Sequence, residues 1–372
     1  MSRSLLFGLL LIVAFLSCGK RGYLSEMQVN SEMTVEIITL IQDSTLNVRA
    51  LDISKDDHIY FAGSKGEIGG IYKYTEDSLN PSIVNKHTAE IITRLQDEDR
   101  APNFRSISRQ KERTFTLSIG SPALLFRTQL GNSKIVYTET HEKAFYDSMA
   151  FWNDQEGIAI GDPTDDCMSI IITRDGGNTW NRLACDNLPR AREGEAAFAA
   201  SDTNIAIIND HTWVATGGMA SRILYSPDKG RTWEVFETPI VQDRPTTGMY
   251  SLDFHDKKNG FAIGGDYTRP ADNSANKIRT QDGGKTWQLV AKNQSPGYRS
   301  CIQYIPNGGA EKLVAVGFEG IDYSADAGNT WQHLSDEGFY TVRFLNDSVA
   351  FAGGNGRVAK VVFRESENRF RK

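Results

Sequence analysis

One eight-residue pattern, Ser/Thr-x-Asp-x-Gly-x-Thr-Trp, occurs four times in the second half of this 372-residue chain. In each copy the Asp can accept hydrogen bonds from turn amides, and the Gly can take a positive φ. The Trp then starts the next strand with a large apolar side chain to bury. Each copy predicts a β-hairpin, and four copies predict a repeat architecture. We call these segments the Trp hairpins, and their Asp and Trp residues are Asp175 and Trp180, Asp228 and Trp233, Asp282 and Trp287, and Asp326 and Trp331.

The spacing between the Trp hairpins fits a four-stranded unit. Their Asp residues lie 53, 54 and 44 residues apart, which is the length of one β-propeller blade with variable loops. A short apolar strand ending in Gly precedes each hairpin position, and this landmark occurs seven times. The first two repeats keep the strands but lack the motif. The seven strands are 58–63, 116–120, 157–161, 213–217, 261–264, 313–317 and 349–353.

The two ends of the chain complement each other. The last repeat stops after its third strand, 357–363, and an unmatched apolar strand, 34–39, precedes the first repeat. Pairing these two strands would complete the last blade and leave no exposed edge. The sequence therefore predicts an all-β fold, a seven-bladed β-propeller of four-stranded blades over residues 34–372, closed by its N-terminal strand. The Trp hairpins then lie on one face, and the connections between blades (D–A) and between second and third strands (B–C) lie on the other.

The N-terminus resembles an export signal. Arg3 precedes a 12-residue apolar run, Leu5–Leu16, which is too short to span a bilayer and suits a signal-peptide core. The run ends in Ser17-Cys18, which resembles the lipobox of bacterial lipoproteins. We expect residues 1–17 to be a signal peptide and 18–33 a tether lipidated at Cys18; ordinary secretion, with Cys18 removed or free, is the alternative. No Asp follows Cys18, so the resemblance implies the periplasmic side of the outer membrane rather than the inner membrane.

The remaining cysteines and the histidines limit the chemistry. Cys167 and Cys185 flank the third repeat's hairpin, where opposed strands can satisfy disulfide geometry; two reduced core cysteines are an equal alternative. Cys301 has no evident partner. The six His residues show no paired spacing, so we expect no metal site, and no glycine-rich nucleotide loop opens a helix, so we expect no cofactor. With a net charge of −6 and no basic cluster, nucleic acid is not an expected partner.

Polar residues gather at the predicted D–A and B–C connections. These connections all lie on one face, around the mouth of the central channel, where loops converge on a concavity. Any one of these residues could instead hold neighbouring blades together. Polar residues with only that structural role should, however, occur on both faces of the propeller and not mainly on one. The predicted ligand-binding residues are Arg105, Tyr146, Asp147, Glu195, Tyr250, Tyr298 and Arg299.

The same segments resemble a known group of proteins. The Trp hairpins match the Asp-box of BNR-like propellers, and five further segments are similar to bacterial propellers related to the photosystem II stability/assembly factor. This resemblance covers nearly all of the chain after residue 34 and implies a non-catalytic assembly module that binds protein. The oxidoreductase label common in this group has no support in these residues. The segments are 145–148, 160–163, 193–201, 264–270 and 297–300.

Two classes of function fit these features. The first is a lipid-anchored periplasmic scaffold, a monomer, that binds a protein or a glycan on its D–A/B–C face. The second is a glycoside hydrolase, because sialidases and some glucan hydrolases use Asp-box propellers. Its candidate catalytic residues are Asp147, Asp162, Glu195, Tyr250 and Asp266.

The sequence contains residues of the types that a sialidase site requires. Arg105, Arg222 and Arg299 would hold a substrate carboxylate, and Tyr250 would attack with Glu195 as its base. However, the Arg-Ile-Pro opening of sialidases is absent, since Arg105 is followed by Ser-Ile-Ser. Sialidase propellers also have six blades, and glucan hydrolases of this type use a cleft between two propellers. The sequence therefore favours binding over catalysis.

Overall fold

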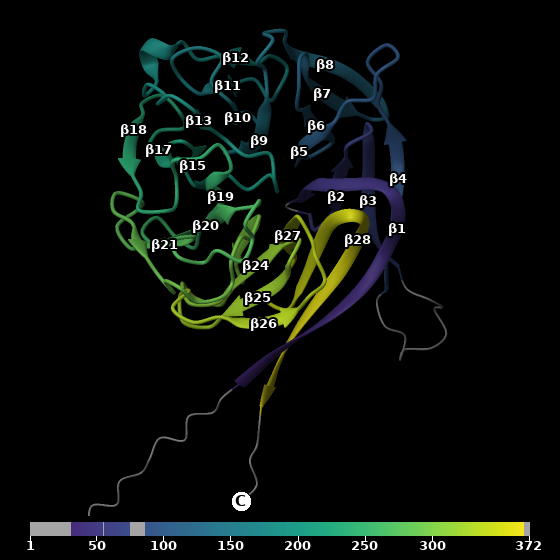
Figure 1. Ribbon diagram of the computed structural model, residues 1–372. Coiled ribbons are helices and arrows are strands. Elements are labelled where there is room, and N and C mark those ends of the chain that lie inside the picture. Colours follow the sequence, from purple (N-terminus) through teal and green to yellow (C-terminus); the bar gives the residue numbers. More distant parts are fainter. Residues whose placement is uncertain (1–30, 55, 75–85, 368–372) are drawn as a thin grey trace, which may run out of the picture.

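The chain folds into a ring of antiparallel β-sheets around a central axis (Figure 1). This computed structural model describes residues 31–54, 56–74 and 86–367. The predicted signal peptide, Cys18 and most of the predicted tether lie outside the described residues. The first strand begins at Ser31, three residues before the predicted start of the propeller. The predicted all-β propeller of four-stranded units is confirmed.

Four of the sheets contain four strands each, and in each sheet neighbouring strands follow one another along the chain, apart from an insertion between β15 and β17. Their strands are β5 Phe104–Gln110, β6 Arg113–Ser118, β7 Ala123–Gln129 and β8 Asn132–Glu139; β9 Tyr146–Phe151, β10 Gly157–Gly161, β11 Ser169–Thr173 and β12 Asn181–Arg182; β14 Ile205–Ile208, β15 His211–Ala215, β17 Arg222–Ser226 and β18 Glu234–Glu237; β23 Cys301–Tyr304, β24 Leu313–Gly317, β25 Gly320–Ser324 and β26 Gln332–Ser335.

Two further sheets contain six strands each. One adds the short strands β13 and β16 to the inner edge of a four-stranded unit. The other contains both ends of the described chain. Their strands are β13 Glu195–Ala196, β16 Gly217–Gly218, β19 Thr247–Phe254, β20 Gly260–Asp266, β21 Lys277–Thr280 and β22 Gln288–Leu289; β27 Thr341–Phe344, β28 Val349–Glu367, β1 Ser31–Ile53, β2 Ile59–Gly63, β3 Glu67–Tyr74 and β4 Lys86–Arg94.

The predicted count of seven separate blades is wrong, because the strands form six hydrogen-bonded sheets. The difference arises at the seam of the ring, where β1 and β28 each continue through two predicted repeats. The first part of β1 pairs with β28, and its second part pairs with β2. The strands that the sequence assigns to the first and last repeats therefore belong to one six-stranded sheet.

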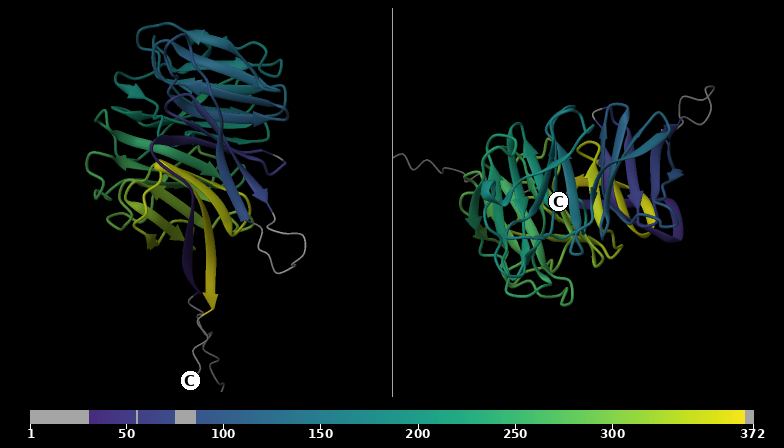
Figure 2. Two further views of the ribbon diagram at one scale, coloured as in Figure 1. Left: turned by 90° about the vertical axis from the view of Figure 1, so that its right-hand side faces the viewer. Right: turned by 90° about the horizontal axis from the view of Figure 1, so that it is seen from above.

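The predicted closure of the ring is confirmed. Residues 34–39 pair with residues 359–364 in an antiparallel register that runs from Thr34 opposite Arg364 to Thr39 opposite Ala359. Figures 1 and 2 show β1 and β28 side by side as a ribbon that leaves the ring, so that both ends of the described chain lie together. The closure is a strand pairing between the two ends of the chain.

Each Trp hairpin joins the last two strands of its four-stranded unit, and its Asp organises the turn as predicted. In the first copy, Oδ1 of Asp175 accepts the amide of Thr179 at 2.9 Å, and Oδ2 accepts the Thr179 hydroxyl at 2.7 Å. The Thr173 hydroxyl accepts the amide of Gly177 at 2.8 Å. The other three copies repeat these bonds with equivalent residues.

The hairpin glycines also bring neighbouring sheets together. Gly176 and Gly177 have φ angles of +73° and +75°. A Cβ atom at Gly177 would lie 2.3 Å from the ring of Phe115 in the adjacent sheet. A Cβ atom at Gly328, whose φ is +81°, would meet Phe261 of the adjacent sheet at 2.1 Å. Glycine is therefore required both by the turn conformation and by the close packing of the next sheet.

The four tryptophans are buried to different degrees. Trp180 is 5% exposed and Trp287 is 7% exposed, whereas Trp233 and Trp331 are only half-buried. Trp180 makes an edge contact with Phe151 of its own sheet at 5.6 Å and lies 6.3 Å from Phe115 of the adjacent sheet. The predicted burial of these side chains is confirmed for Trp180 and Trp287 and holds only in part for Trp233 and Trp331.

A disulfide joins Cys167 to Cys185, with the two Cα atoms 5.4 Å apart. Cys167 precedes β11, and Cys185 begins the short 3-10 helix η1, Cys185–Asn187. Of the two alternatives that the sequence leaves open, the structure has the oxidised pair. Cys301 is buried as a free thiol, as expected.

We predict that Trp287→Ala lowers the free energy of unfolding by about 3–5 kcal/mol, because a buried Trp leaves a large cavity. Trp331→Ala is the matched control, since both indoles donate to the carbonyl oxygen of the Gly three residues before them but Trp331 is less buried. Urea unfolding of both variants should show the smaller loss for Trp331→Ala. Equal losses would contradict the burial difference.

We predict that replacing residues 34–39 by a Gly/Ser segment of equal length destabilises the ring by at least about 3 kcal/mol, because Val35 and Ile37 lose their packing against the core. Thermal unfolding and size-exclusion chromatography test this. Ile38→Ala is the control, because Ile38 points outward on the same strand and is 39% exposed. A replacement that unfolds like the native chain would show that closure by this strand is dispensable.

Candidate functional site

Four innermost strands, β1, β5, β9 and β19, each contain a β-bulge near the N-terminal end of the segment that pairs with the next strand. The register of β1 against β2 shifts between Val48 and Ala50, which leaves Arg49 unpaired. The same shift leaves Arg105 unpaired in β5, Asp147 in β9 and Tyr250 in β19. A β-bulge re-aims the side chain of its extra residue. The ring therefore presents a set of bulged residues at one mouth of its channel.

Residues 197–204, which we call the plug segment, cross the channel between β13 and β14. The backbone oxygens of Ala199 and Ala200 accept hydrogen bonds from Arg105 at 3.0 Å and Arg49 at 3.3 Å. The Ser201 hydroxyl donates to the Ser300 carbonyl oxygen at 2.6 Å. Further bonds join the plug segment to β9, β19, β23 and β27. The plug segment is thus tied to every other sheet.

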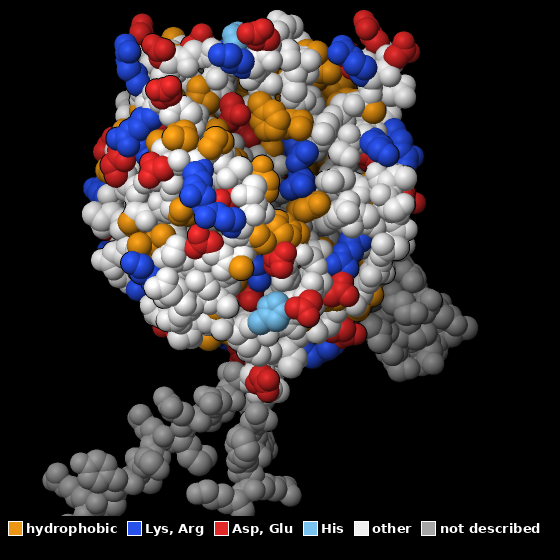
Figure 3. Space-filling view, in the orientation of Figure 1, with side chains coloured by type: hydrophobic (Ala, Val, Ile, Leu, Met, Phe, Trp, Pro, Cys, Tyr) orange, Lys and Arg blue, Asp and Glu red, His pale blue; other side chains and the backbone are white. Residues whose placement is uncertain are grey.

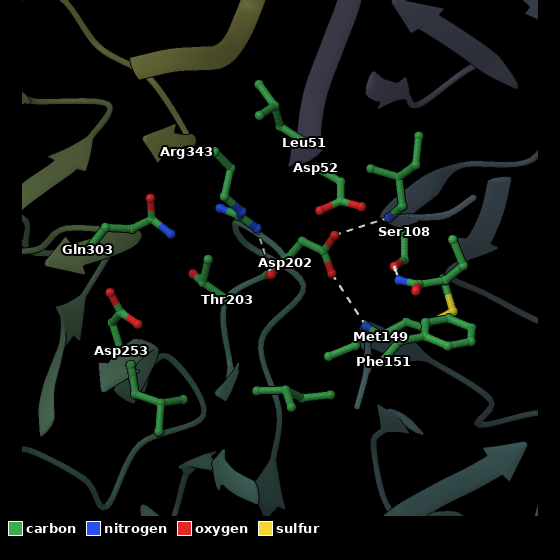
Figure 4. Close-up of a pocket in the computed structure, with 15 residues that line it drawn as sticks. Leu51, Asp52, Ser108, Met149, Phe151, Asp202, Thr203, Asp253, Gln303 and Arg343 are labelled. Carbon is green, nitrogen blue, oxygen red and sulfur yellow. Dashed lines mark hydrogen bonds between the residues drawn. The ribbon is translucent and has the colours of Figure 1, made fainter. Parts of the chain in front are cut away.

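Asp202 is the centre of the plug segment. It has a φ of +60°, and its carboxylate accepts the amide of Ile107 at 3.0 Å and the amide of Met149 at 3.4 Å. Arg343 donates to its backbone oxygen at 2.8 Å. Figure 4 shows Asp202 between Arg343 on one side and Met149 on the other. Burial raises the pKa of Asp202 to about 8, although the charge of Arg343 and the amide of Ile107 act to lower it.

A cavity of about 460 Å³, which we call the mouth pocket, lies on the D–A/B–C face with the plug segment as its floor. Its walls come from the connections between and within the sheets, as predicted. Figure 3 shows a face of the ring where hydrophobic side chains gather around the centre, with charged side chains between them. The lining residues are Arg49, Arg105, Phe145, Asp162, Ala196, Ala197, Phe198, Ala199, Ala200, Pro245, Tyr250, Tyr267, Tyr298, Phe318 and Tyr340.

Aromatic rings form much of the wall of the mouth pocket. Phe198 stacks on Tyr250 with ring centres 4.0 Å apart, and Tyr298 contacts Tyr250 edge-on at 4.8 Å. Phe318 lies against Tyr298 at 5.3 Å. Tyr267 and Phe318 remain 48% and 40% exposed. The buried rings therefore hold one another in place, and the exposed ones are available to a ligand.

Two arginines lie at the other side of the mouth pocket. The guanidinium of Arg49 lies 3.7 Å from the centre of the Tyr340 ring, and its Nε is buried without a hydrogen-bond partner. Burial lowers the pKa of Arg49, and burial, helped by the charge of Arg49, lowers the pKa of Arg105 to about 10. Both side chains remain cationic at neutral pH. Among the described residues neither forms an ion pair, so the pair offers positive charge to a ligand.

Two neighbouring carboxyl groups, Asp147 and Asp162, lie at the wall of the mouth pocket. Asp147 is fully buried, and neither of its oxygens has a hydrogen-bond partner. Asp162 lines the mouth pocket, and its Oδ1 accepts the amide of Ala197 at 2.8 Å. Burial, together with the charge of Asp162, raises the pKa of Asp147 well above its ordinary value, and burial raises the pKa of Asp162 to about 6. Asp147 therefore lies under the wall of the pocket, and Asp162 lies on it.

The other predicted site residues do not line the mouth pocket. Glu195 accepts from Arg222 in a buried ion pair at 2.5 Å, and Arg299 forms a second one with Asp322 at 2.6 Å. Tyr146 is buried in the core, where its hydroxyl lies 3.2 Å from that of Tyr137. Asp266 is buried and accepts from the amide and hydroxyl of Thr268. These four side chains stabilise the connections around the site.

The sialidase arrangement is not formed by these residues. Arg222 and Arg299 each bind a different carboxylate, so they cannot join Arg105 in one substrate clamp. The Tyr250 hydroxyl donates to the carbonyl oxygen of Thr246 at 2.8 Å, and Glu195 is occupied by Arg222. Of the seven predicted ligand-binding residues, Arg105, Tyr250 and Tyr298 line the mouth pocket, and Asp147 lies beneath its wall.

Sequence reasoning missed Arg49, Phe198 and Tyr340. Arg49 and Tyr340 each come directly before the innermost paired residues of their repeats, 50–53 and 341–344. Arg105 and Tyr250 occupy the equivalent position in their own repeats. Alignment of the repeats on this place would have found them. Phe198 had no such signal, because it belongs to the plug segment, which has no counterpart in the other repeats.

Below the plug segment, a second cavity of about 250 Å³ is lined by polar side chains that join one innermost strand to the next. Asp52 accepts the amide of Arg109 at 2.6 Å, Asp253 accepts that of Tyr304 at 2.8 Å, and Gln303 accepts that of Phe344 at 3.1 Å. Figure 4 shows Asp52, Asp253 and Gln303 around Asp202 and Thr203. These groups are structural ties along the channel.

Within the described parts of the chain, no group of three or more His, Cys, Asp or Glu side chains is arranged to hold a metal ion. No helix in the same residues is long and apolar enough to cross a membrane.

Comparisons with known proteins identify the fold. The family model for Sortilin-Vps10 ("Sortilin, neurotensin receptor 3") matches residues 168–303, which is less than half of the chain. No match was found among curated protein sequences.

Solved structures match over most of the chain. A structure of YCF48 bound to D1 peptide has 15% identity and a TM-score of 0.58 over 88% of this chain and 96% of that one. YCF48 from Cyanidioschyzon merolae has 12% identity and a TM-score of 0.59 over 88% and 98%. The WD40 propeller domain of Doa1 has 12% identity and a TM-score of 0.56 over 92% and 100%. At these identities the likeness shows the propeller fold alone.

We predict that the free energy of unfolding falls as the pH rises from about 5 to about 8. The folded pKa of Asp202, about 8, exceeds its unfolded value of roughly 3.9, so the folded state binds more protons in this interval. Asp202→Asn should make the slope less negative by up to about 1.4 kcal/mol per pH unit, the value for one proton. Urea unfolding at several pH values measures the slope.

Asp256→Asn is the control for this experiment. Burial acts to raise the pKa of Asp256, but the hydrogen bonds from Asn259 and Lys258 together outweigh it and lower the pKa, so Asp256 titrates below the interval tested. An unchanged slope in Asp202→Asn would mean that Asp202 is ionised in the folded protein.

Proposed function

We propose that the chain is a non-catalytic binding module that holds a segment of a partner protein in the mouth pocket. The observation that carries this proposal is a pocket of about 460 Å³ that combines exposed aromatic rings with two arginines that have no ion-pair partner among the described residues. Aromatic and Arg side chains are the groups that contribute most to protein recognition. The pocket therefore suits a polypeptide with an apolar side chain to bury and carbonyl or carboxylate oxygens to accept from the arginines.

The pocket is built to bind without rearranging. Arg49 and Arg105 are fixed by bonds to the plug segment, and Tyr250 is fixed between Phe198 and Tyr298. A site whose side chains are already ordered loses less conformational entropy when a ligand binds. This rigidity supports recognition of a specific segment.

The comparisons give independent support. Two of the matching structures are YCF48 propellers, and one of them is a complex with a D1 peptide. A propeller of the same overall fold therefore binds a peptide in at least one case. The resemblance of this sequence to the assembly-factor group favours the same class of function, with a different partner.

We further propose that the module acts at the periplasmic side of the outer membrane, as a monomer held by a lipid on Cys18. This proposal rests on the sequence alone, since Cys18 lies outside the described residues. The paired strands β1 and β28 extend away from the ring, and the N-terminal end of β1 lies at the outer end of this ribbon (Figure 2). An anchor attached there would leave the mouth pocket free.

Glycoside hydrolysis is less well supported. Its two carboxyl groups must both reach the substrate. Asp147 has no exposed surface, Glu195 is held by Arg222, and Asp266 is held by Thr268 and Arg269. Only Asp162 among the candidate acids lines the mouth pocket.

We predict that the double variant Tyr267→Ala, Phe318→Ala binds peptide ligands at least about tenfold more weakly, which corresponds to the loss of about 1.4 kcal/mol of contact. The measurement is binding of the purified chain to an array of peptides from cell-envelope proteins, compared with a glycan array. Both side chains are exposed, so the variant should keep its stability.

Ile92→Ala is the matched control, because Ile92 is 48% exposed on β4 and does not line the mouth pocket. Equal binding by the double variant and by Ile92→Ala would place the binding surface elsewhere. Binding to glycans and not to peptides would overturn the proposed ligand class.

A further inference from the structure

We propose that the mouth pocket continues into an acidic groove, and that the two together bind one extended polypeptide segment with an apolar anchor followed or preceded closely by a basic residue. The apolar side chain occupies the mouth pocket, and the basic side chain lies over Asp162 and Glu193. This inference rests on the proposed function and adds the sequence class of its ligand.

The groove is a third cavity, of about 510 Å³, beside the mouth pocket, and we call it the outer pocket. Asp162 and Ala196 line both cavities, so the two cavities lie side by side. One side of the outer pocket comes from the connection between β10 and β11, and the other from residues 191–196. A polypeptide in extended form can therefore cover both cavities.

Negative charge predominates in the outer pocket. Its wall carries the carboxylates of Asp162, Asp165, Asp166, Glu193 and Glu195, and only two basic side chains. Three of the carboxylates already have cationic partners: Asp165 binds Arg182, Asp166 binds Arg190, and Glu195 binds Arg222.

Asp162 and Glu193 are different. In the part of the chain that the structure describes, neither is bonded to a basic side chain. Asp162 accepts one bond, from the amide of Ala197 to its Oδ1, and its Oδ2 faces no described donor. These two carboxylates are available to a cationic group of a ligand.

A second observation points to the same place. Asp147, which lies near Asp162 under the pocket wall, is completely buried, and both of its oxygens lack hydrogen-bond partners. A buried carboxyl without partners is costly, and nearby positive charge reduces that cost. Arg105 lies near Asp147 but donates its hydrogen bonds to Asn103 and Ala199, so the carboxyl group stays unpaired. A cation bound over Asp162 would offset the charge of Asp162 that acts on Asp147, whereas an anion there would add to it.

The two pockets have opposite electrostatic character, and this sets how the ligand lies. Arg49 and Arg105 border the mouth pocket and repel a basic side chain, while its rings accept an apolar one. The basic side chain is therefore directed to the outer pocket. Complementary charge of this kind contributes to specificity and to the rate of association.

The experiment measures fluorescence anisotropy of labelled peptides with the purified chain. The probe is fluorescein-Gly-Ser-Phe-Gly-Lys-Gly-Ser-Gly, with a second version in which two more Gly residues separate Phe from Lys. We expect the tighter of these to bind about three- to tenfold more strongly than its Lys→Glu version at low ionic strength. The difference should shrink in 0.5 M NaCl, because the Debye length falls from about 8 Å at physiological salt to about 4 Å.

Two protein variants locate the effect. Asp162→Asn keeps the oxygen that accepts the Ala197 amide, and Glu193→Gln changes an exposed side chain, so both should fold normally. Each should reduce the preference for the Lys peptide over the Glu peptide, and the double variant should abolish it. Glu234→Gln is the charge-matched control, because Glu234 is exposed on β18 and lines neither pocket.

The outcomes separate this inference from the proposed function. If the Phe peptides bind and Tyr267→Ala, Phe318→Ala weakens them, but Lys and Glu versions bind equally, the inference is wrong and the proposed function stands. If the preference for Lys survives in the double variant, the outer pocket is not its cause. If neither peptide binds, or a Phe→Ala peptide binds as well as the original, both proposals are overturned.

Discussion

The hydrogen bonds of the plug segment hold the centre of this molecule together. A ring of sheets leaves a channel along its axis, and residues 197–204 cross it. The apolar residues 197–200 line the mouth pocket, and the short polar residues 201–204 lie deeper in the channel. Asp202 accepts amides from two sheets on one side, and Arg343 donates to the segment from the other. Buried polar groups of this kind contribute stability only when they are satisfied together. The ring positions the plug segment, and the plug segment in turn fixes the ring.

The same segment creates the site. Its first residues form the floor of the mouth pocket, and the carbonyl oxygens of Ala199 and Ala200 hold Arg105 and Arg49 in place. Bulges in the surrounding strands turn these arginines and Tyr250 toward the mouth. The pocket is therefore made by two kinds of irregularity, a crossing segment and a set of bulges, on an otherwise regular scaffold. That separation lets the scaffold stay rigid while the connections determine what is bound.

Charge is divided sharply over this small area. Glu195 and Arg299, which look like functional residues in the sequence, are consumed in buried ion pairs that support the connections. Asp162, Asp147 and Glu193 form no such ion pair among the described residues, and neither do Arg49 and Arg105, which line the mouth pocket together with Asp162. A ligand that carries both an apolar and a basic group can place the apolar group against the aromatic rings and the basic group beside the unpaired carboxylates. This is why binding of a polypeptide explains the site better than hydrolysis of a glycan does.

The sequence by itself determined the all-β propeller, the geometry of the Trp hairpins and the pairing of the two chain ends. These features depend on local turn chemistry and on the alternation of apolar residues, which a sequence displays directly. Tertiary structure alone decided that β1 and β28 continue through the seam, since hydrogen bonding across a junction leaves no mark on composition. It also decided the roles of Glu195, Arg222 and Arg299. The sequence shows that a charged residue lies at a connection, but it does not show whether the partner of that residue is another side chain or a ligand. Phe198 and the plug segment could not be foreseen, because a segment that crosses the axis owes its place to contacts with every other sheet.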